Sequence, residues 1–143
     1  MRKLALAQII ENASKIDSVE DRAQYLRDND SDQLRYILEL ALTEGVKWEI
    51  PEGAPPYKPC DYIDIEGRLY QESRTLYMYL LGNKPELTRL KRESLFIGLL
   101  ESIDKRDAEL LIKVKDQKLP RTISTQVVNL AFPGLINEQF SQA

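Results

Sequence analysis

The strongest constraint on the fold is a helical apolar stripe that ends at Gly45. Apolar side chains recur there every three or four residues, as Leu34, Ile37, Leu38, Ala41 and Leu42. This spacing places them on one face of an α-helix, and a glycine after the last turn is a common helix terminator. The pattern therefore predicts an amphipathic helix that begins near a cap at Asp30 or Ser31 and stops at Gly45.

Two shorter helices are predicted before this one. The first runs over residues 2–14, because Leu6, Ile9, Ile10 and Ala13 share the same spacing. The second begins at Ser18, a favourable N-cap residue, with acidic side chains in its first turn where the helix dipole stabilises them. It ends within residues 28–30.

Four further helices are predicted after residue 66. The fourth turns Leu69, Leu76 and Leu80 inward, and the fifth has Pro85 in its first turn. Leu87, Leu90, Ile97 and Leu100 recur on one side of the fifth helix. Asp104 caps the sixth helix, and Ser124 or Thr122 begins a seventh that ends at Pro133-Gly134. Strand-like alternation is confined to residues 46–50, so we expect an all-α fold, a single compact bundle of about seven helices over residues 1–143.

A proline-rich loop over residues 46–65 interrupts the helical pattern. Four prolines and a glycine exclude a helix over most of it, namely Pro51, Gly53, Pro55, Pro56 and Pro59. A loop of this length either packs on the surface or holds a partner. Its aromatic residues fit both alternatives, because they can pin the loop to the core or remain available for contact.

The composition favours a protein of the cytoplasm. The single cysteine, Cys60, cannot form an internal disulfide, so the fold tolerates a reducing compartment. No run reaches the roughly 20 apolar residues that span a bilayer, and polar residues interrupt the beginning of the chain too early for a signal peptide. We therefore expect a soluble protein with no membrane partner.

The sequence gives little support to catalysis. It contains no histidine, and its six glycines are scattered rather than grouped in a phosphate-binding pattern. Asp28, Asp30 and Asp32 alternate as in a calcium loop, but the glycine and the distant glutamate of that loop are missing. We interpret these aspartates as caps and turn residues. We expect a protein that is not an enzyme, with no catalytic residue, cofactor or metal site.

Positive charge is concentrated in the second half of the chain. The net charge is −3, yet residues 1–66 hold 8 Lys/Arg against 14 Asp/Glu, whereas residues 67–143 hold 12 against 9. Two clusters stand out, one formed by Lys84, Arg89, Lys91 and Arg92, the other by Lys113, Lys115, Lys118 and Arg121. Hydroxyls follow the second cluster at a predicted helix N-terminus, where phosphate is often held, at Thr122, Ser124 and Thr125. These residues are our candidates for contact with DNA phosphates.

The order of three motifs resembles the N-terminal helical DNA-binding domain of the ATP-dependent DNA ligases of T-even-type phages. The segments are Asp32-Gln33-Leu34-Arg35-Tyr36-Ile37-Leu38, Gly45-Val46-Lys47-Trp48 and Val128-Asn129-Leu130-Ala131-Phe132-Pro133-Gly134-Leu135-Ile136. The chain is also similar to small proteins of T-even-like phages and cyanophages that share Pro51-Glu52-Gly53-x-Pro55-Pro56-Tyr57-Lys58-Pro59. The resemblance to these small phage proteins implies no activity for this chain.

The ligase resemblance implies a module that grips duplex DNA through its minor groove and backbone. The matching positions are Lys118, Arg121, Thr122, Ser124 and Thr125, although the ligases usually have Cys-Gly where this chain has Leu119-Pro120. In the ligases a catalytic core follows this domain; we expect none here, and the Lys-x-Asp-Gly motif of nucleotidyl transfer is missing. The resemblance thus implies a phage accessory protein in the cytoplasm of the infected host.

Two functions follow as expectations. The first is a module that binds duplex DNA or a DNA-processing complex through the basic clusters, without reading bases. The second is a protein–protein adaptor for a replication, host or virion protein that has lost DNA binding. Its contact residues would be the aromatic residues of the loop, Trp48, Tyr57 and Tyr62. The two functions differ in whether the basic clusters meet on one face of the folded protein.

Overall fold

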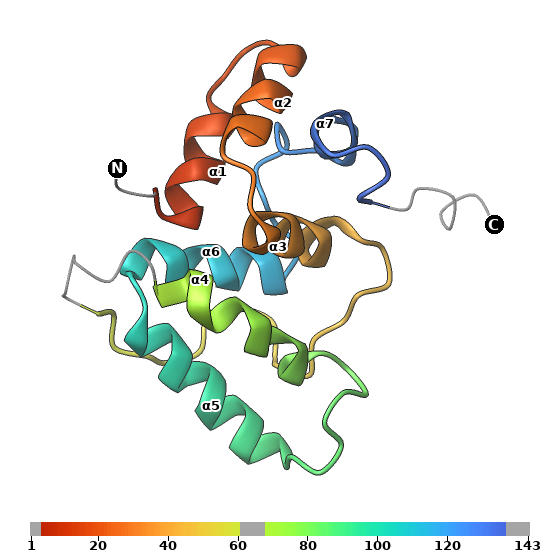
Figure 1. The fold of residues 1–143 in the computed structure, drawn as a ribbon. Helices are drawn as coiled ribbons and strands as arrows, with labels where there is room; N and C mark the ends of the chain where they lie inside the picture. Colours follow the sequence, from red (N-terminus) through yellow and green to blue (C-terminus); the bar gives the residue numbers. More distant parts are fainter. Residues whose placement is uncertain (1–3, 61–67, 137–143) are drawn as a thin grey trace.

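Two groups of helices pack on opposite sides of a central pair, α3 and α6 (Figure 1). The computed structural model describes residues 4–60 and 68–136. In chain order the elements are α1 (Leu6–Ser14), α2 (Val19–Asp28), α3 (Asp32–Leu42), α4 (Arg68–Glu72), the 3-10 helix η1 (Ser73–Tyr79), α5 (Arg89–Ser102), α6 (Lys105–Lys115) and α7 (Thr125–Ala131). The first group contains α1, α2 and α7, and the second contains α4, η1 and α5.

The predicted all-α class with seven α-helices is confirmed for the described part of the chain. No strand forms there, and an isolated antiparallel bridge joins Trp48 to Leu80. The core is built from the apolar stripes of the helices; that of α3, for example, is fully enclosed at Leu34, Ile37 and Leu38.

Side-chain caps fix most of the helix starts where the sequence places them. Ser18 and Ser31 accept hydrogen bonds from the third residue of α2 and of α3, at 3.3 and 3.0 Å. Ser124 does the same for α7 at 3.2 Å. The predicted starts at Ser18, Ser31 and Ser124 are confirmed because each cap satisfies an amide that the helix itself leaves free.

The predicted fourth helix is divided into α4 and the 3-10 helix η1. Its buried side chains after Leu69 are Ser73, Leu76 and Tyr79, which are three residues apart. A 3-10 helix has three residues per turn, so this spacing aligns them toward the core. Leu80 is only half-buried, because the chain has left the helix by that residue.

The fifth helix begins later than predicted and turns a different face inward. Thr88 caps α5 by accepting a hydrogen bond from Lys91 N at 3.1 Å, and Pro85 lies in the preceding turn. The inward residues are Arg92, Phe96, Leu99 and Leu100, whereas the side chain of Leu90 is 79% exposed. Because the inward face of α5 includes Arg92, the spacing of apolar residues in the sequence does not predict that face.

Arg92 is 2% exposed and its guanidinium is surrounded by oxygen atoms. Its Nη1 lies 3.0 Å from Glu49 Oε2, and Nε donates to Met78 O at 3.1 Å. Its Nη2 donates to the carbonyls of Lys84, at 2.9 Å, and Asn83, at 3.5 Å. One side chain thereby joins α5 to η1, to the turn before α5 and to the loop after α3.

Residues 46–60, which we call the arm, pack against η1, α5 and α6. Ile50 is buried, and the Trp48 ring stacks on Tyr79 with centroids 6.2 Å apart and meets the edge of Phe96 at 6.0 Å. Gly53 N donates to Asp116 Oδ2 at 3.0 Å. The prediction that aromatic residues pin this loop to the core is confirmed for Trp48, while residues 61–65 of the predicted loop lie outside the described residues.

Asp104, the predicted cap of α6, is confirmed by a 2.8 Å hydrogen bond from Arg106 N. Burial raises the pKa of its carboxyl, but the side-chain and backbone hydrogen bonds from Arg106, together with that residue's charge, outweigh this effect and lower the pKa below 3.8. A carboxyl whose pKa is lowered by folding stabilises the folded state above its unfolded pKa, and that contribution is lost as the pH falls through the folded value.

We predict that Arg92→Leu lowers the free energy of unfolding by about 3 kcal/mol, because it leaves Glu49 without its buried partner and carbonyls without a donor. Urea unfolding followed by circular dichroism measures this loss. Arg27→Leu, the same change at an exposed site of α2, should alter stability by less than about 0.5 kcal/mol. Equal effects of the two substitutions would contradict the role given to Arg92.

We predict that Asp104→Asn costs about 1 kcal/mol near neutral pH, because the amide keeps an acceptor for the helix but loses the ionic contact with Arg106. The difference in stability from the wild type should shrink as the pH falls below 3.8. Urea titrations at a series of pH values measure it. A difference that is constant down to pH 2 would show that the carboxylate charge is unimportant.

Candidate interaction surfaces

The first basic cluster is partly neutralised by its own neighbours. Lys84 Nζ lies 3.6 Å from Glu86 Oε1, and Arg89 Nε lies 3.4 Å from Glu93 Oε1. Lys91 is exposed and has no ion pair among the described residues. The cluster therefore presents less free positive charge than its sequence suggests.

Two of the predicted DNA-binding cations are buried. Besides Arg92, the side chain of Lys115 is only 1% exposed. Its Nζ lies 2.6 Å from Asp116 Oδ1 and donates to Pro51 O at 2.8 Å. The prediction that Arg92 and Lys115 face phosphate is wrong, because both cations satisfy carbonyl and carboxylate oxygens inside the protein and are shielded from solvent.

The second basic cluster retains three accessible cations. Lys113 and Arg121 are exposed, with no ion pair among the described residues, and Lys118 Nζ lies 3.6 Å from Glu52 Oε2 of the arm. The distance and the exposure of the Lys118–Glu52 pair make it a weak interaction. Lys113, Lys118 and Arg121 remain candidates for phosphate contact.

Two of the three hydroxyls next to this cluster, those of Thr122 and Ser124, form hydrogen bonds that hold the fold. Thr122 Oγ1 donates to Ser14 O at 2.9 Å, which ties the segment before α7 to the end of α1. Ser124 Oγ accepts from Val127 N as the cap of α7. Thr125 is the first residue of α7 and is half-buried. A phosphate at this position would therefore compete with contacts that already exist.

The two basic clusters do not form one face. Figure 1 shows that the turn leading into α5 lies at one end of the molecule. The connection from α6 to α7 lies away from it, hydrogen-bonded to the end of α3 through Gln117 and to the end of α1 through Thr122. The arm contacts both clusters through carboxylates, because Glu49 pairs with Arg92 and Glu52 with Lys118. A carboxylate of the arm thus lies next to a cation of each cluster.

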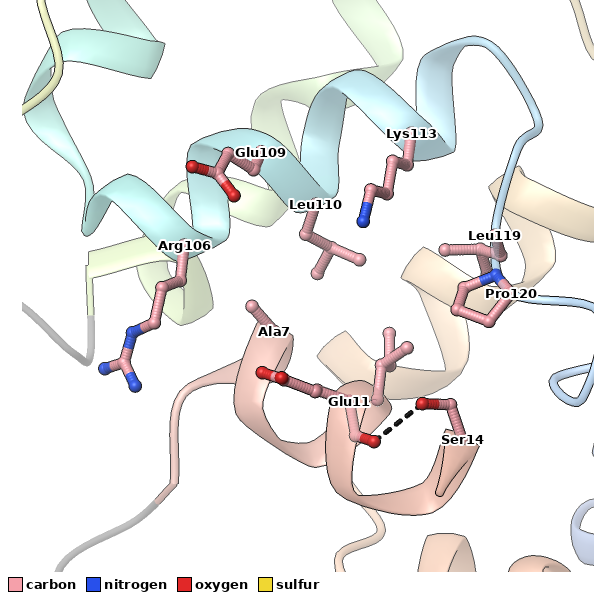
Figure 2. Close-up of a pocket in the computed structure, with 10 residues that line it drawn as sticks. Ala7, Glu11, Ser14, Arg106, Glu109, Leu110, Lys113, Leu119 and Pro120 are labelled. Atoms are coloured by element: carbon pink, nitrogen blue, oxygen red, sulfur yellow. Dashed lines mark hydrogen bonds between the residues drawn. The ribbon is translucent and has the colours of Figure 1, made fainter. Parts of the chain in front are cut away.

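A groove of about 210 Å³ lies between α1 and α6 (Figure 2). Lys113 projects from α6 toward α1, with Glu11 and Glu109 nearby, and Leu119 and Pro120 close one end. The Leu119-Pro120 departure from the ligase pattern therefore forms part of a groove wall. The charged side chains that line the groove are two carboxylates, Glu11 and Glu109, and two cations, Lys113 and Arg106, so the groove has no excess of positive charge for a phosphate group.

The three aromatic residues predicted to contact a partner differ in their burial and in their contacts within the fold. Trp48 is half-buried and held by the rings of Tyr79 and Phe96. Tyr57 is half-buried, and burial together with the charge of Glu109 raises the pKa of its hydroxyl. Tyr62, the third predicted contact residue, lies outside the described residues.

Two hollows meet at Ile50 and Pro51, and we call their union the arm groove. The first, of about 390 Å³, is lined by Trp48, Glu49, Ile50, Pro51, Leu81 and Arg89. The second, of about 350 Å³, is mostly apolar and lies between the arm and α5, with Ile50, Pro51, Glu52, Gly53, Ala54, Pro55, Pro56, Glu93, Phe96 and Ile97 around it.

Sequence reasoning missed Leu81 as a surface residue. It is 61% exposed and lines the arm groove beside Trp48. In the sequence Leu81 directly follows Leu80, which is predicted to face inward in the last turn of the fourth helix, so it does not stand out as a surface residue. The three-residue repeat of Ser73, Leu76 and Tyr79 is the signal that excludes Leu81 from that stripe.

Residues 4–60 and 68–136 contain neither a cluster of metal ligands nor a membrane-spanning helix. No group of three or more His, Cys, Asp or Glu side chains is placed to hold a metal ion. No helix there is both long and apolar enough to cross a membrane.

A family model described as "Family of unknown function (DUF6433)" matches residues 9–121. The matched region runs from α1 to the segment before α7 and therefore includes the arm groove and all members of both basic clusters. No curated protein matches the chain.

Proposed function

Because that match covers more than half of the chain, this protein belongs to the DUF6433 family, and we propose that it is a non-enzymatic protein–protein adaptor. The arm groove is its contact surface in this proposal. The observation that carries it is Leu81, a leucine that is 61% exposed beside a half-buried tryptophan in a groove. Exposed apolar side chains around an aromatic residue are typical of sites where proteins bind one another.

The placement of the basic residues also favours an adaptor over a DNA-binding module. Tight contact with a DNA backbone needs several cations on one face. Here Arg92 and Lys115 are buried, and arm carboxylates contact cations of both clusters. The net charge of −3 further weakens attraction to a polyanion.

We further propose that the helical scaffold is related to the N-terminal domain of the T-even-type phage ligases. The motif order from Asp32 to Ile136 supports this relationship, and it makes a phage replication protein, a host protein or a virion component the natural partner. The protein would then act in the cytoplasm of the infected host. The absence of histidine supports a role without catalysis.

We predict that Leu81→Glu reduces recovery of the partner at least tenfold, because it places a charge in the apolar part of the contact surface. The measurement is affinity capture from nuclease-treated lysate of infected cells, with quantitative mass spectrometry of what is retained. Leu130→Glu on α7 is the matched control, since Leu130 is 43% exposed and lies outside the arm groove.

Circular dichroism must show that both variants keep the helical content of the wild type. Equal recovery by Leu81→Glu and by the wild type would remove the arm groove as the contact surface. Recovery that disappears after nuclease treatment would favour a nucleic-acid partner.

The second candidate function is weak binding of duplex DNA through the connection between α6 and α7. The exposure of Lys113, Lys118 and Arg121 favours it, since these cations remain accessible after folding. With about three phosphates contacted, the slope of log affinity against log salt concentration would be near −3. Such binding would be sequence-independent because no base contact is involved.

We predict that Lys118→Glu with Arg121→Glu abolishes any binding to a short duplex at low salt, whereas Lys91→Glu leaves most of it. Fluorescence anisotropy with a labelled duplex measures both affinity and its salt dependence. Binding that survives the paired substitution, or that does not weaken as salt rises, would exclude this surface as the DNA contact.

A further inference from the structure

We infer that the outer face of α5 binds a second copy of this protein, with the two α5 helices antiparallel. We define this face by five exposed residues that are three or four positions apart or adjacent, namely Leu90, Lys91, Ser94, Gly98 and Glu101. The inference goes beyond the proposed adaptor function and does not depend on it. It follows from the exposure of a leucine on this face and from the order of its charges.

Nothing in the described part of the chain covers the outer face of α5. The helix packs against α6 and η1 with its opposite side, which carries Phe96, Leu99 and Leu100. Figure 1 shows α5 along an edge of the molecule, with α6 and α4 on its inner side. Leu90 is 79% exposed and is the most exposed large apolar residue among those described. An exposed leucine on an uncovered helix favours burial against another protein surface.

The middle of the outer face carries no charge. Ser94 and Gly98 are its residues between Lys91 and Glu101. A helix face that stays in water typically carries charged or long polar side chains, and a glycine within a helix lowers its stability relative to alanine. A Cβ added at Gly98 would have no atom within 4 Å, so this chain itself provides no packing contact there. A second helix can approach closely at such a position.

The order of the charges selects an antiparallel second copy as the occupant. Lys91 and Glu101 are the charged residues of the outer face, and each is five positions from Phe96. Ser94 and Gly98 are each two positions from it. A two-fold axis at the level of Phe96 therefore places each Lys91 next to Glu101 of the other copy, and each Ser94 next to Gly98. Such self-complementarity is what a two-fold dimer requires, whereas parallel helices would bring like charges together.

Both charges are available for this contact. The Lys91 side chain forms no ion pair or hydrogen bond among the described residues. Glu101 Oε2 accepts a hydrogen bond from Lys58 N at 2.8 Å, and the Glu101 carboxylate has no ion pair among the described residues. A carboxylate accepts several hydrogen bonds, so Glu101 keeps the capacity to bind a lysine.

The length of α5 sets the strength of the dimer. The helix has 14 residues and is about 21 Å long. A contact through one face of a helix of this length belongs to the small interfaces, for which we expect a dissociation constant of about 10 to 100 µM. Arg89, Glu93, Phe96 and Ile97 of the same helix line the arm groove, so each copy in the dimer would present an arm groove beside the shared contact.

Sedimentation velocity of the whole protein from about 5 to about 500 µM tests the inference, since this range spans the expected dissociation constant. The wild type should pass from monomer to dimer. Lys91→Glu should weaken the dimer at least tenfold, because it places like charges together at both ends of the contact. The double variant Lys91→Glu with Glu101→Lys should restore the wild-type affinity within threefold, because it exchanges the two partners of each pair.

Two further variants separate shape from charge. Gly98→Gln should weaken the dimer at least tenfold without a change of charge, because its side chain occupies the space between the two helices. Arg27→Glu on α2, the same charge reversal as Lys91→Glu at an exposed site away from α5, should leave the affinity within twofold. Circular dichroism should show wild-type helical content for every variant, since each substituted side chain is exposed.

The mixture of two single variants gives a second test. Lys91→Glu and Glu101→Lys each repel themselves, but together they form two attractive pairs, so the mixture should dimerise at least tenfold more tightly than either variant alone. A wild type that remains monomeric at every concentration would overturn the inference. Dimerisation that is unchanged in Lys91→Glu and Gly98→Gln would also overturn it, because the contact would then lie elsewhere.

Discussion

The buried contact between Arg92 and Glu49 is the interaction on which the arrangement of the second helical group depends. A guanidinium that is 2% exposed is stable only when its donors are satisfied, and here a carboxylate and backbone carbonyls do so. These acceptors come from the arm, from η1 and from the turn before α5. Since the same Glu49 also accepts from Gly82 N, this network holds the arm next to the segment that follows η1.

Two ion pairs of the described residues join the acidic first half of the sequence to the basic second half. Glu49 and Glu52 come from the acidic half, and they pair with Arg92 and Lys118 from the basic half. Charge asymmetry along a sequence therefore does not imply charge asymmetry across the surface. Together with the burial of Arg92 and Lys115, these two pairs reduce the accessible positive charge of both basic clusters.

Prediction succeeded where the determining interactions are local. Ser18, Ser31, Asp104 and Ser124 cap helices through contacts within three residues, so their roles follow from the sequence alone. It failed for α5, whose inward face contains Arg92. An arginine is buried only when distant acceptors are brought to it, and no local pattern reports that those acceptors exist. Of the candidate site residues, Trp48, Lys113, Lys118 and Arg121 retain accessible positions or groove contacts, whereas Arg92 and Lys115 do not.

The sequence by itself determined the helical class, most helix starts and the non-helical course of the arm, because residue spacing, caps and prolines act on the backbone within a few residues. The tertiary structure alone decided which cations are buried, that the basic clusters are separated, and that Leu81 lies in a groove beside Arg89. These features depend on the packing of segments that are far apart in the sequence, such as Pro51 and Lys115, which are 64 residues apart, and only folding brings such segments together.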